Sequence, residues 1–264
     1  MNRHARLRTL LLAACGFAGT ACAATQTLNP VADAFVSSNT SQNSLGTAAI
    51  RDSNYGAAGA LAISAAGMSK GEFDSLLRFD FSGVKSGFDS ALGPGLWVIN
   101  SISLQLTLAQ PNNAIFNSPS AAGTVAVKWM QNDSWVEGTG TPAVPTTTGI
   151  TFSTLPSFLS VADEALGSFA FTNATSGTNT LSLGLTPLFL ADATAGSTVS
   201  LLMLPGDSSI ATVTNSNNFG LSGNPARPLL TVNASAVPEP GSGMLIAAGA
   251  LGWLARRRRH ACRA

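Results

Sequence analysis

The chain has 264 residues, of which 45% are hydrophobic and 10% charged, and its formal net charge is +1. Residues 24–237 hold six basic against twelve acidic side chains, a net charge of −6, which excludes a basic nucleic-acid-binding surface. The histidines and cysteines all lie nearer the ends, at His4, His260, Cys15, Cys22 and Cys262. This central part therefore cannot form Ser-His-Asp or Cys-His nucleophiles or the common zinc sites, and only carboxylate chemistry is left.

The N-terminal residues have the order of a secretory signal peptide. Three arginines come before an apolar stretch that starts at Leu10, and small residues follow at positions 21–23. This order predicts a signal peptide over residues 1–23, removed by signal peptidase. The alternative is a lipoprotein signal ending at Cys15, which would leave an apolar core of only residues 9–14.

Short alternating segments dominate the central part. Ser75, Leu77, Phe79 and Phe81 alternate with Leu76, Arg78 and Asp80, a pattern typical of a half-buried strand. Further strands are predicted over residues 33–37, 61–64, 99–109, 124–130, 167–172, 180–185, 198–204, 210–214 and 229–232. Turn residues separate them, which indicates an antiparallel sandwich or barrel.

A single short helix is predicted over residues 187–193, because Pro187 suits a first helical turn and Gly196 suits its end. The stretch of residues 139–149 is rich in Thr, Pro and Gly and is compatible with a domain linker. Its flanking strands look like neighbours in one sheet, so we interpret it as a long loop within a single domain over residues 24–236.

The C-terminal residues combine three features in order. Pro238, Glu239 and Pro240 precede an apolar run over residues 241–255, and Arg256, Arg257, Arg258 and Arg259 follow it. Prolines break a helix before the run, and the arginines are expected to stay on the cytoplasmic side. As a helix the run would span roughly 22 Å, less than a hydrocarbon core of about 30 Å.

This arrangement over residues 237–264 resembles the PEP-CTERM sorting signal of Gram-negative bacteria. The resemblance implies that an exosortase cuts near the Pro-Glu-Pro motif, so that the membrane holds the precursor only transiently. The body would then reach the cell surface or the extracellular polymer. The alternative is an ordinary C-terminal anchor.

A series of short motifs in the body resembles the DNRLRE domain. They lie at residues 33–36, 54–56, 61–63, 76–81, 102–106, 135–139, 150–152, 185–188 and 224–230. The resemblance implies a jelly-roll β-sandwich grouped with carbohydrate-binding modules. Three features depart from the pattern and bear on any shared ligand surface: an insertion at residues 88–97, a polar stretch at residues 112–123, and Phe152 where Trp is more usual.

Two kinds of ligand-binding side chain are candidates. Arg78 and Asp80 share one strand face and could hydrogen-bond sugar hydroxyls, with an intersheet salt bridge as the alternative. Tyr55 and Trp135 could stack on sugar faces, although Trp135 follows a polar turn and could lie under a loop. Trp97 and Trp129 are further aromatic candidates, and the alternation around Trp129 favours a core position.

A structural calcium ion is a further hypothesis, since related modules often hold Ca²⁺ between loops. Asp33, Asp52, Asp133 and Asp207 are its loop-adjacent candidates, with solvated surface acids as the alternative. Together these features predict an exported, non-catalytic protein that binds extracellular polysaccharide or has a structural role. The other hypothesis is a carboxylate-dependent polysaccharide-degrading enzyme, for which Glu72, Glu137 and Glu164 are the available glutamates.

Overall fold

The computed structural model describes residues 22–110, 115, 120–221 and 223–237. Within them, Ala23–Ala236 form one compact unit. The expectations for most of the signal peptide, and for the tail after Val237, concern residues outside the described ones.

This unit contains eleven strands and two α-helices among its described residues. The strands are β1 (Ala23–Leu28), β2 (Ala32–Ser37), β3 (Ala60–Ser64), β4 (Phe73–Asp80), β5 (Trp97–Thr107), β6 (Gly123–Met130), β7 (Glu164–Phe171), β8 (Thr178–Leu183), β9 (Thr198–Pro205), β10 (Ala211–Asn215) and β11 (Leu229–Ala236). The helices are α1 (Ser82–Leu92) and α2 (Pro187–Ala195), and two short 3₁₀ helices are η1 (Ile50–Asp52) and η2 (Leu155–Phe158).

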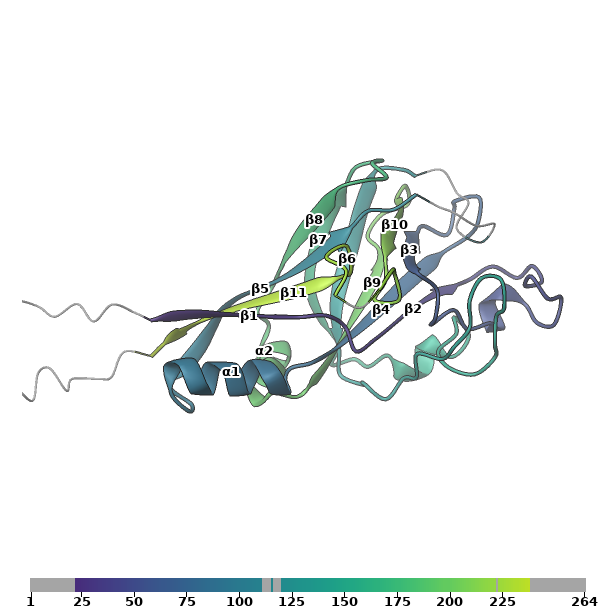
Figure 1. The fold of residues 1–264 in the computed structure, drawn as a ribbon. Helices are drawn as coiled ribbons and strands as arrows, with labels where there is room; N and C mark the ends of the chain where they lie inside the picture. The colour runs from purple at the N-terminus through teal and green to yellow at the C-terminus, as the bar shows by residue number, and fades with distance from the viewer. Residues whose placement is uncertain (1–21, 111–114, 116–119, 222, 238–264) are drawn as a thin grey trace, which may run out of the picture. The chain divides into compact units, whose positions relative to one another are not determined.

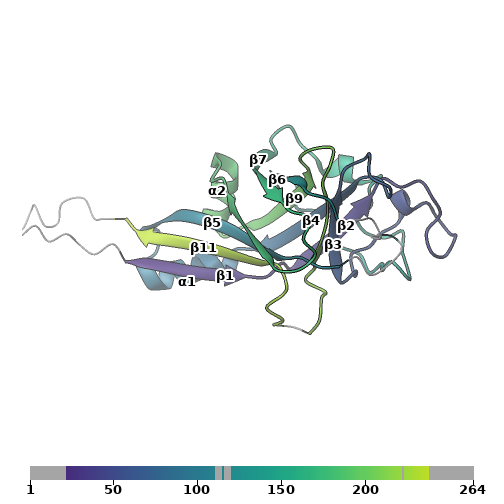
Figure 2. The same ribbon diagram turned by 90° about the horizontal axis from the view of Figure 1, so that it is seen from above.

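The strands form two antiparallel sheets that pack as a sandwich (Figures 1 and 2). One sheet has four strands in the order β1-β11-β5-β8. The other has seven, in the order β10-β3-β4-β9-β6-β7, with β2 paired to β4. The prediction of an antiparallel β-sandwich is confirmed, and the fold is mostly β with two short helices.

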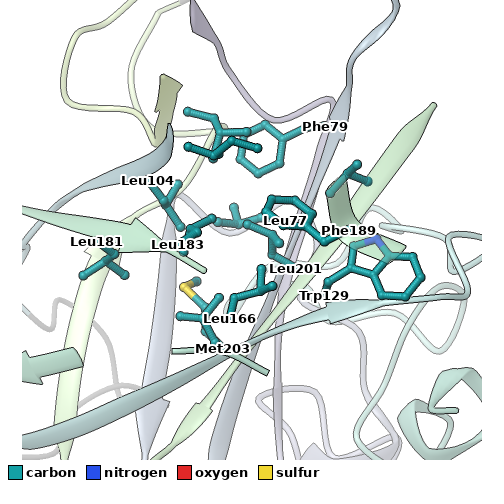
Figure 3. Close-up of a cluster of buried hydrophobic side chains, with 14 of the residues drawn as sticks. Leu77, Phe79, Leu104, Trp129, Leu166, Leu181, Leu183, Phe189, Leu201 and Met203 are labelled. Atoms are coloured by element: carbon teal, nitrogen blue, oxygen red, sulfur yellow. The ribbon is translucent and has the colours of Figure 1, made fainter. Parts of the chain in front are cut away.

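The main core lies between the two sheets. Leu104 and Leu181 from the four-stranded sheet meet Leu77, Phe79 and Leu201 from the seven-stranded sheet (Figure 3). All five are buried. These positions follow the alternation of their strands, so the inner face of the sandwich is the face that the sequence pattern predicts.

The prediction of a half-buried β4 is wrong, because both faces of this strand are covered. Leu77 and Phe79 face the main core, while Leu76 on the other face belongs to a separate cluster with Leu202 and Trp135. This outer cluster forms under residues 131–163, which connect β6 to β7 and which we call the cover loop. A segment far along the chain buries the outer face, and strand alternation carries no sign of it.

Helix α2 matches the predicted helix at its first residue, and Gly196 ends it in the left-handed conformation at φ 76°. Helix α1 was not predicted, and only its last residues fall in the segment 88–97 that was interpreted as an insertion. Only Val84 and Phe88 of α1 are buried, and Gly83 and Gly87 weaken its helical propensity. Helix α1 packs against β1, and a Cβ at Gly87 would meet the end of the flexible Gln26 side chain of that strand.

Strand β1 was not predicted either. It pairs antiparallel with β11 and forms an edge of the four-stranded sheet (Figure 2). None of its side chains is fully buried. A polar strand of this kind lacks the apolar alternation that identifies its neighbours, and it is held mainly by backbone pairing.

Candidate functional site

Arg78 and Asp80 lie on the same face of β4, as predicted, but they bind different groups. Arg78 Nη1 donates to the carbonyl oxygens of Asp133 at 2.9 Å and Trp135 at 2.7 Å. Asp80 Oδ1 accepts from the N–H of Ser82 at 2.9 Å, at the start of α1, and this bond lowers the pKa of the carboxyl. Within the described residues, no salt bridge joins the two side chains.

Trp135 lies under the cover loop and not on the surface. Its side chain is fully buried, and its Nε1 donates to Ser200 Oγ at 2.9 Å. Trp97 and Trp129 are also buried, and Trp129 packs in the main core as the alternation of β6 predicts. None of these three indole rings offers a face to a ligand from solvent in this structure.

Tyr55 is buried in a third cluster. Its ring stacks on that of Phe35, with the ring centroids 4.8 Å apart and an interplanar angle of 8°. The Phe35 ring in turn packs against Phe73, with the two ring centroids 5.8 Å apart. Burial raises the pKa of the Tyr55 phenol. The ring therefore supports the wall of a neighbouring cavity through Phe73 and is not itself exposed to solvent.

Asn54 holds the cover loop in place. Its Nδ2 donates to the carbonyls of Glu137 at 2.7 Å and Ile150 at 2.8 Å. Its Oδ1 accepts from the N–H groups of Gly56 and Gly140, each at 3.1 Å. The motif match at residues 54–56 included Asn54 but assigned no role to it, and the glycine-rich stretch after residue 137 was the only other sign of a close approach.

A cavity of about 600 Å³ opens beside this cluster. Its described lining combines amide and hydroxyl groups with apolar side chains and contains one cation, Lys70, but no carboxylate. The side chains of Gln42 and Lys70 make no hydrogen bond to the described residues, so both remain available to a ligand. Neither residue belongs to a recognisable motif, because the loops that meet here are far apart in the sequence.

The four predicted calcium ligands lie in separate places. Asp52 is exposed and accepts from Ser153 Oγ at 2.5 Å. The Asp207 carboxylate accepts from Ser209, Thr124 and Ile210, and the Ser209 N–H contributes most to the lowering of its pKa. Across the described ranges, no three His, Cys, Asp or Glu side chains gather closely enough to hold a metal ion.

Asp33 is buried and Asp133 is partly buried, whereas Asp52 and Asp207 are exposed. Burial raises the pKa of Asp133, whose backbone carbonyl binds Arg78. Asp33 is 1% exposed, and burial raises its pKa to about 7. Glu137, which was expected only as a possible catalytic acid, lies next to Asp33 and accepts its N–H at 3.2 Å.

The tail of the chain matches a known family model. Residues 236–259 match the family model of the PEP-CTERM protein-sorting motif, which implies export, exosortase processing and sorting to the cell surface. This match covers the tail and does not identify the family of the body. No curated protein matches the chain. Among the described residues, no helix has the length and apolarity needed to cross a membrane.

Proposed function

We propose that this exported protein is a non-catalytic component of the cell surface or extracellular polymer, and that its body binds polysaccharide there. The sorting motif at residues 236–259 supports the destination. The resemblance of the body to the DNRLRE domain supports the ligand class. A purely structural role in the extracellular matrix is the nearest alternative.

The cavity is the observation that carries the binding proposal. Its volume of about 600 Å³ is suited to one or a few sugar rings. Sugar hydroxyls need directional donors and acceptors, which the Gln42 amide and the Lys70 ammonium would supply, while Phe73 and Ile50 would pack on the C–H faces. The positive charge of Lys70 favours sugars that carry a carboxylate.

The enzyme hypothesis remains as a second function class. Glu72 and Asp207 both line a shallow depression of about 270 Å³, which is the arrangement that favours it. Glycoside hydrolysis needs one carboxyl held protonated as the general acid. The lowered pKa of Asp207 suits a base or nucleophile, and Glu72 is the second carboxyl of this depression.

Binding and cleavage can be separated in one experiment on the mature protein isolated from its host. The protein is incubated with the host's extracellular polysaccharide and with a glycan panel, with and without chelator, while released reducing ends are measured. Retention on a glycan without new reducing ends supports the proposal. Release of reducing ends would replace it with the enzyme hypothesis, and neither binding nor release would favour the structural role.

Variants then locate the binding site. Lys70→Ala and Gln42→Ala should each weaken glycan binding about tenfold, the equivalent of one lost hydrogen bond to a charged or polar partner. Lys128→Ala is the matched control, because Lys128 is an exposed lysine of β6 that does not line the cavity. Equal affinity of all three variants for the bound glycan would contradict the assignment of the cavity.

A further inference from the structure

Strand β1 has one side of its backbone unpaired. On the other side it pairs with β11, from Ala23 opposite Ser235 to Leu28 opposite Leu230. Away from β11, its N–H and C=O groups form no backbone hydrogen bond with any described residue. These groups lie along the margin of the four-stranded sheet (Figure 2). An edge of this kind is a template on which a further strand can pair.

Helix α1 leaves this edge accessible. The side chains of Ala24, Gln26 and Leu28 share one face of β1, and Ala24 and Leu28 pack against the main core. Gly87 of α1 lies against the Gln26 side chain, so the helix covers this inner face. The hydrogen-bonding direction of a strand is perpendicular to its side chains, and the helix therefore does not occupy it.

The opposite edge of the same sheet is partly occupied. Strand β8 lies against β7 of the other sheet. Directly after β8, the Gly184 N–H donates to the Leu166 carbonyl of β7 at 2.7 Å. The body thus closes on itself along β8, and β1 is the more accessible edge of the two.

No feature of β1 opposes pairing with another strand. Edge strands are normally protected by charged side chains, prolines or bulges. The β1 sequence is AATQTL, and its register with β11 has no shift. The exposed positions are Ala23, Thr25 and Thr27, and threonines pair favourably across neighbouring strands. Cleavage of the expected signal peptide would leave residues 24–28 of this strand in the mature protein.

The distribution of charge favours a second copy as the partner. Six basic and twelve acidic side chains give residues 24–237 a net charge of −6, so two copies repel one another. The four-stranded sheet adds nothing to this repulsion, because β1, β5, β8 and β11 contain no charged side chain. In the neighbouring α1, Lys85 and Asp89 form an ion pair with each other.

We propose that two copies of this protein pair through β1, antiparallel about a two-fold axis, and join their four-stranded sheets into one continuous sheet. With the axis at Gln26, Thr25 lies opposite Thr27 of the second copy, on the same face of the joined sheet. The assembly closes at two copies, because each β1 edge is then used. The proposal does not depend on glycan binding.

The dimer should be weak. One pair of short strands buries less surface than a standard protein–protein interface, so a dissociation constant of about 10⁻⁵–10⁻⁴ M is expected. The rival arrangement pairs β1 of one copy with β8 of the next. It uses two different edges, leaves one of each free and grows into an open chain instead of a closed dimer.

The test uses the mature protein isolated from its host, without added glycan. Sedimentation equilibrium from about 1 µM to about 1 mM should show conversion of monomer to dimer. Amide hydrogen exchange in residues 24–28 should slow as the dimer forms, because the outer N–H groups become paired. A monomer at every concentration would overturn the proposal, and growth beyond a dimer would replace it with the β1–β8 chain.

Charge substitutions locate the contact. Thr27→Lys and Thr27→Glu each bring like charges together across the axis and should weaken the dimer about tenfold or more. An equal mixture of the two variants brings opposite charges together and should restore pairing, which unfolded variants could not do. Thr180→Lys is the matched control, at an exposed threonine of β8, and should dimerise like wild type. Unchanged dimers in both Thr27 variants, or an equal loss in Thr180→Lys, would overturn the proposal.

Discussion

The Arg78 guanidinium lies over the ring of Trp135, 4.8 Å from its centroid, and also donates to the Trp135 carbonyl at 2.7 Å. One strand side chain thus holds both the ring and the backbone of the cover loop. Leu76 and Leu202 lie beneath the loop in the outer cluster. This contact therefore keeps a second hydrophobic core closed on the outer face of the seven-stranded sheet.

Replacing Arg78 should open this second core. Arg78→Ala loses two hydrogen bonds from a charged donor and the contact with the Trp135 ring, and should lower the free energy of unfolding by about 2–4 kcal/mol. Arg78→Lys should recover less than half of the loss, because one ammonium cannot reproduce the planar guanidinium. Urea unfolding measures the free energy of unfolding of both variants. Arg51→Ala, at an exposed arginine that binds one hydroxyl, should cost less than about 0.5 kcal/mol.

Asn54→Ala should be among the most destabilising polar substitutions. It leaves two buried carbonyls and two N–H groups of the cover loop and its neighbours unmatched, and a loss of about 3 kcal/mol or more in urea unfolding is expected. Asn54→Asp keeps the acceptor but loses both donations and should be nearly as damaging. The control is Asn100→Ala at an exposed position of β5. A loss below about 1 kcal/mol would contradict the role assigned to Asn54.

Two glycine substitutions should have opposite effects. A Cβ at Gly140 would lie 1.9 Å from the Asn54 carbonyl oxygen, so Gly140→Ala must displace backbone and should destabilise the fold by about 2 kcal/mol or more. A Cβ at Gly83 in α1 meets no atom within 4 Å, and Gly83→Ala should stabilise the protein by about 0.5–1 kcal/mol. Thermal unfolding of the two variants under the same conditions shows whether each substitution lowers or raises the melting temperature.

Stability should fall as the pH rises from about 4 to 8, because Asp74 is buried in β4. Burial raises the pKa of this carboxyl to about 8, with a smaller contribution from Glu72. A raised folded-state pKa contributes stability that is complete below the unfolded-state pKa and is lost as the pH approaches the folded-state value. The loss attributable to Asp74 is at most about 5 kcal/mol.

Urea unfolding at pH 5 and pH 8 measures this effect. Asp74→Asn should reduce the difference in the free energy of unfolding between pH 5 and pH 8, because an amide does not ionise. Part of the difference should persist, since the Asp33 pKa of about 7 acts in the same direction. Asp52→Asn, at an exposed acid, should leave the difference unchanged. An equal pH dependence in wild type and Asp74→Asn would contradict the burial argument.

The sorting tail should be absent from the mature protein. Exosortase processing implies a new C-terminus near Pro238, Glu239 or Pro240, so mass spectrometry of the protein from the cell surface should find no peptide that ends at Ala264. Replacing Arg256, Arg257, Arg258 and Arg259 by alanine should leave unprocessed precursor in the cell. An intact C-terminal peptide on the surface protein would instead support the ordinary membrane anchor.

Local sequence patterns determined much of the fold. Alternation located ten of the eleven described strands within a few residues, and Pro187 with Gly196 identified α2 and its end. The tail could be interpreted without any structure, because its order of prolines, apolar run and arginines is contiguous. These features depend on residues that are close together in the chain, so the sequence alone is enough to predict them.

Only the tertiary structure decided which of these residues meet. The second face of β4 is buried because the cover loop folds back over it. The same loop buries Trp135 and accepts the hydrogen bond from Arg78. The cavity joins loops that are about 100 residues apart in the chain, and the hydrogen bond between Asp33 and Asn217 joins residues that are 184 apart. Such contacts depend on how the two sheets stack and how long loops fold back, and no local periodicity encodes either.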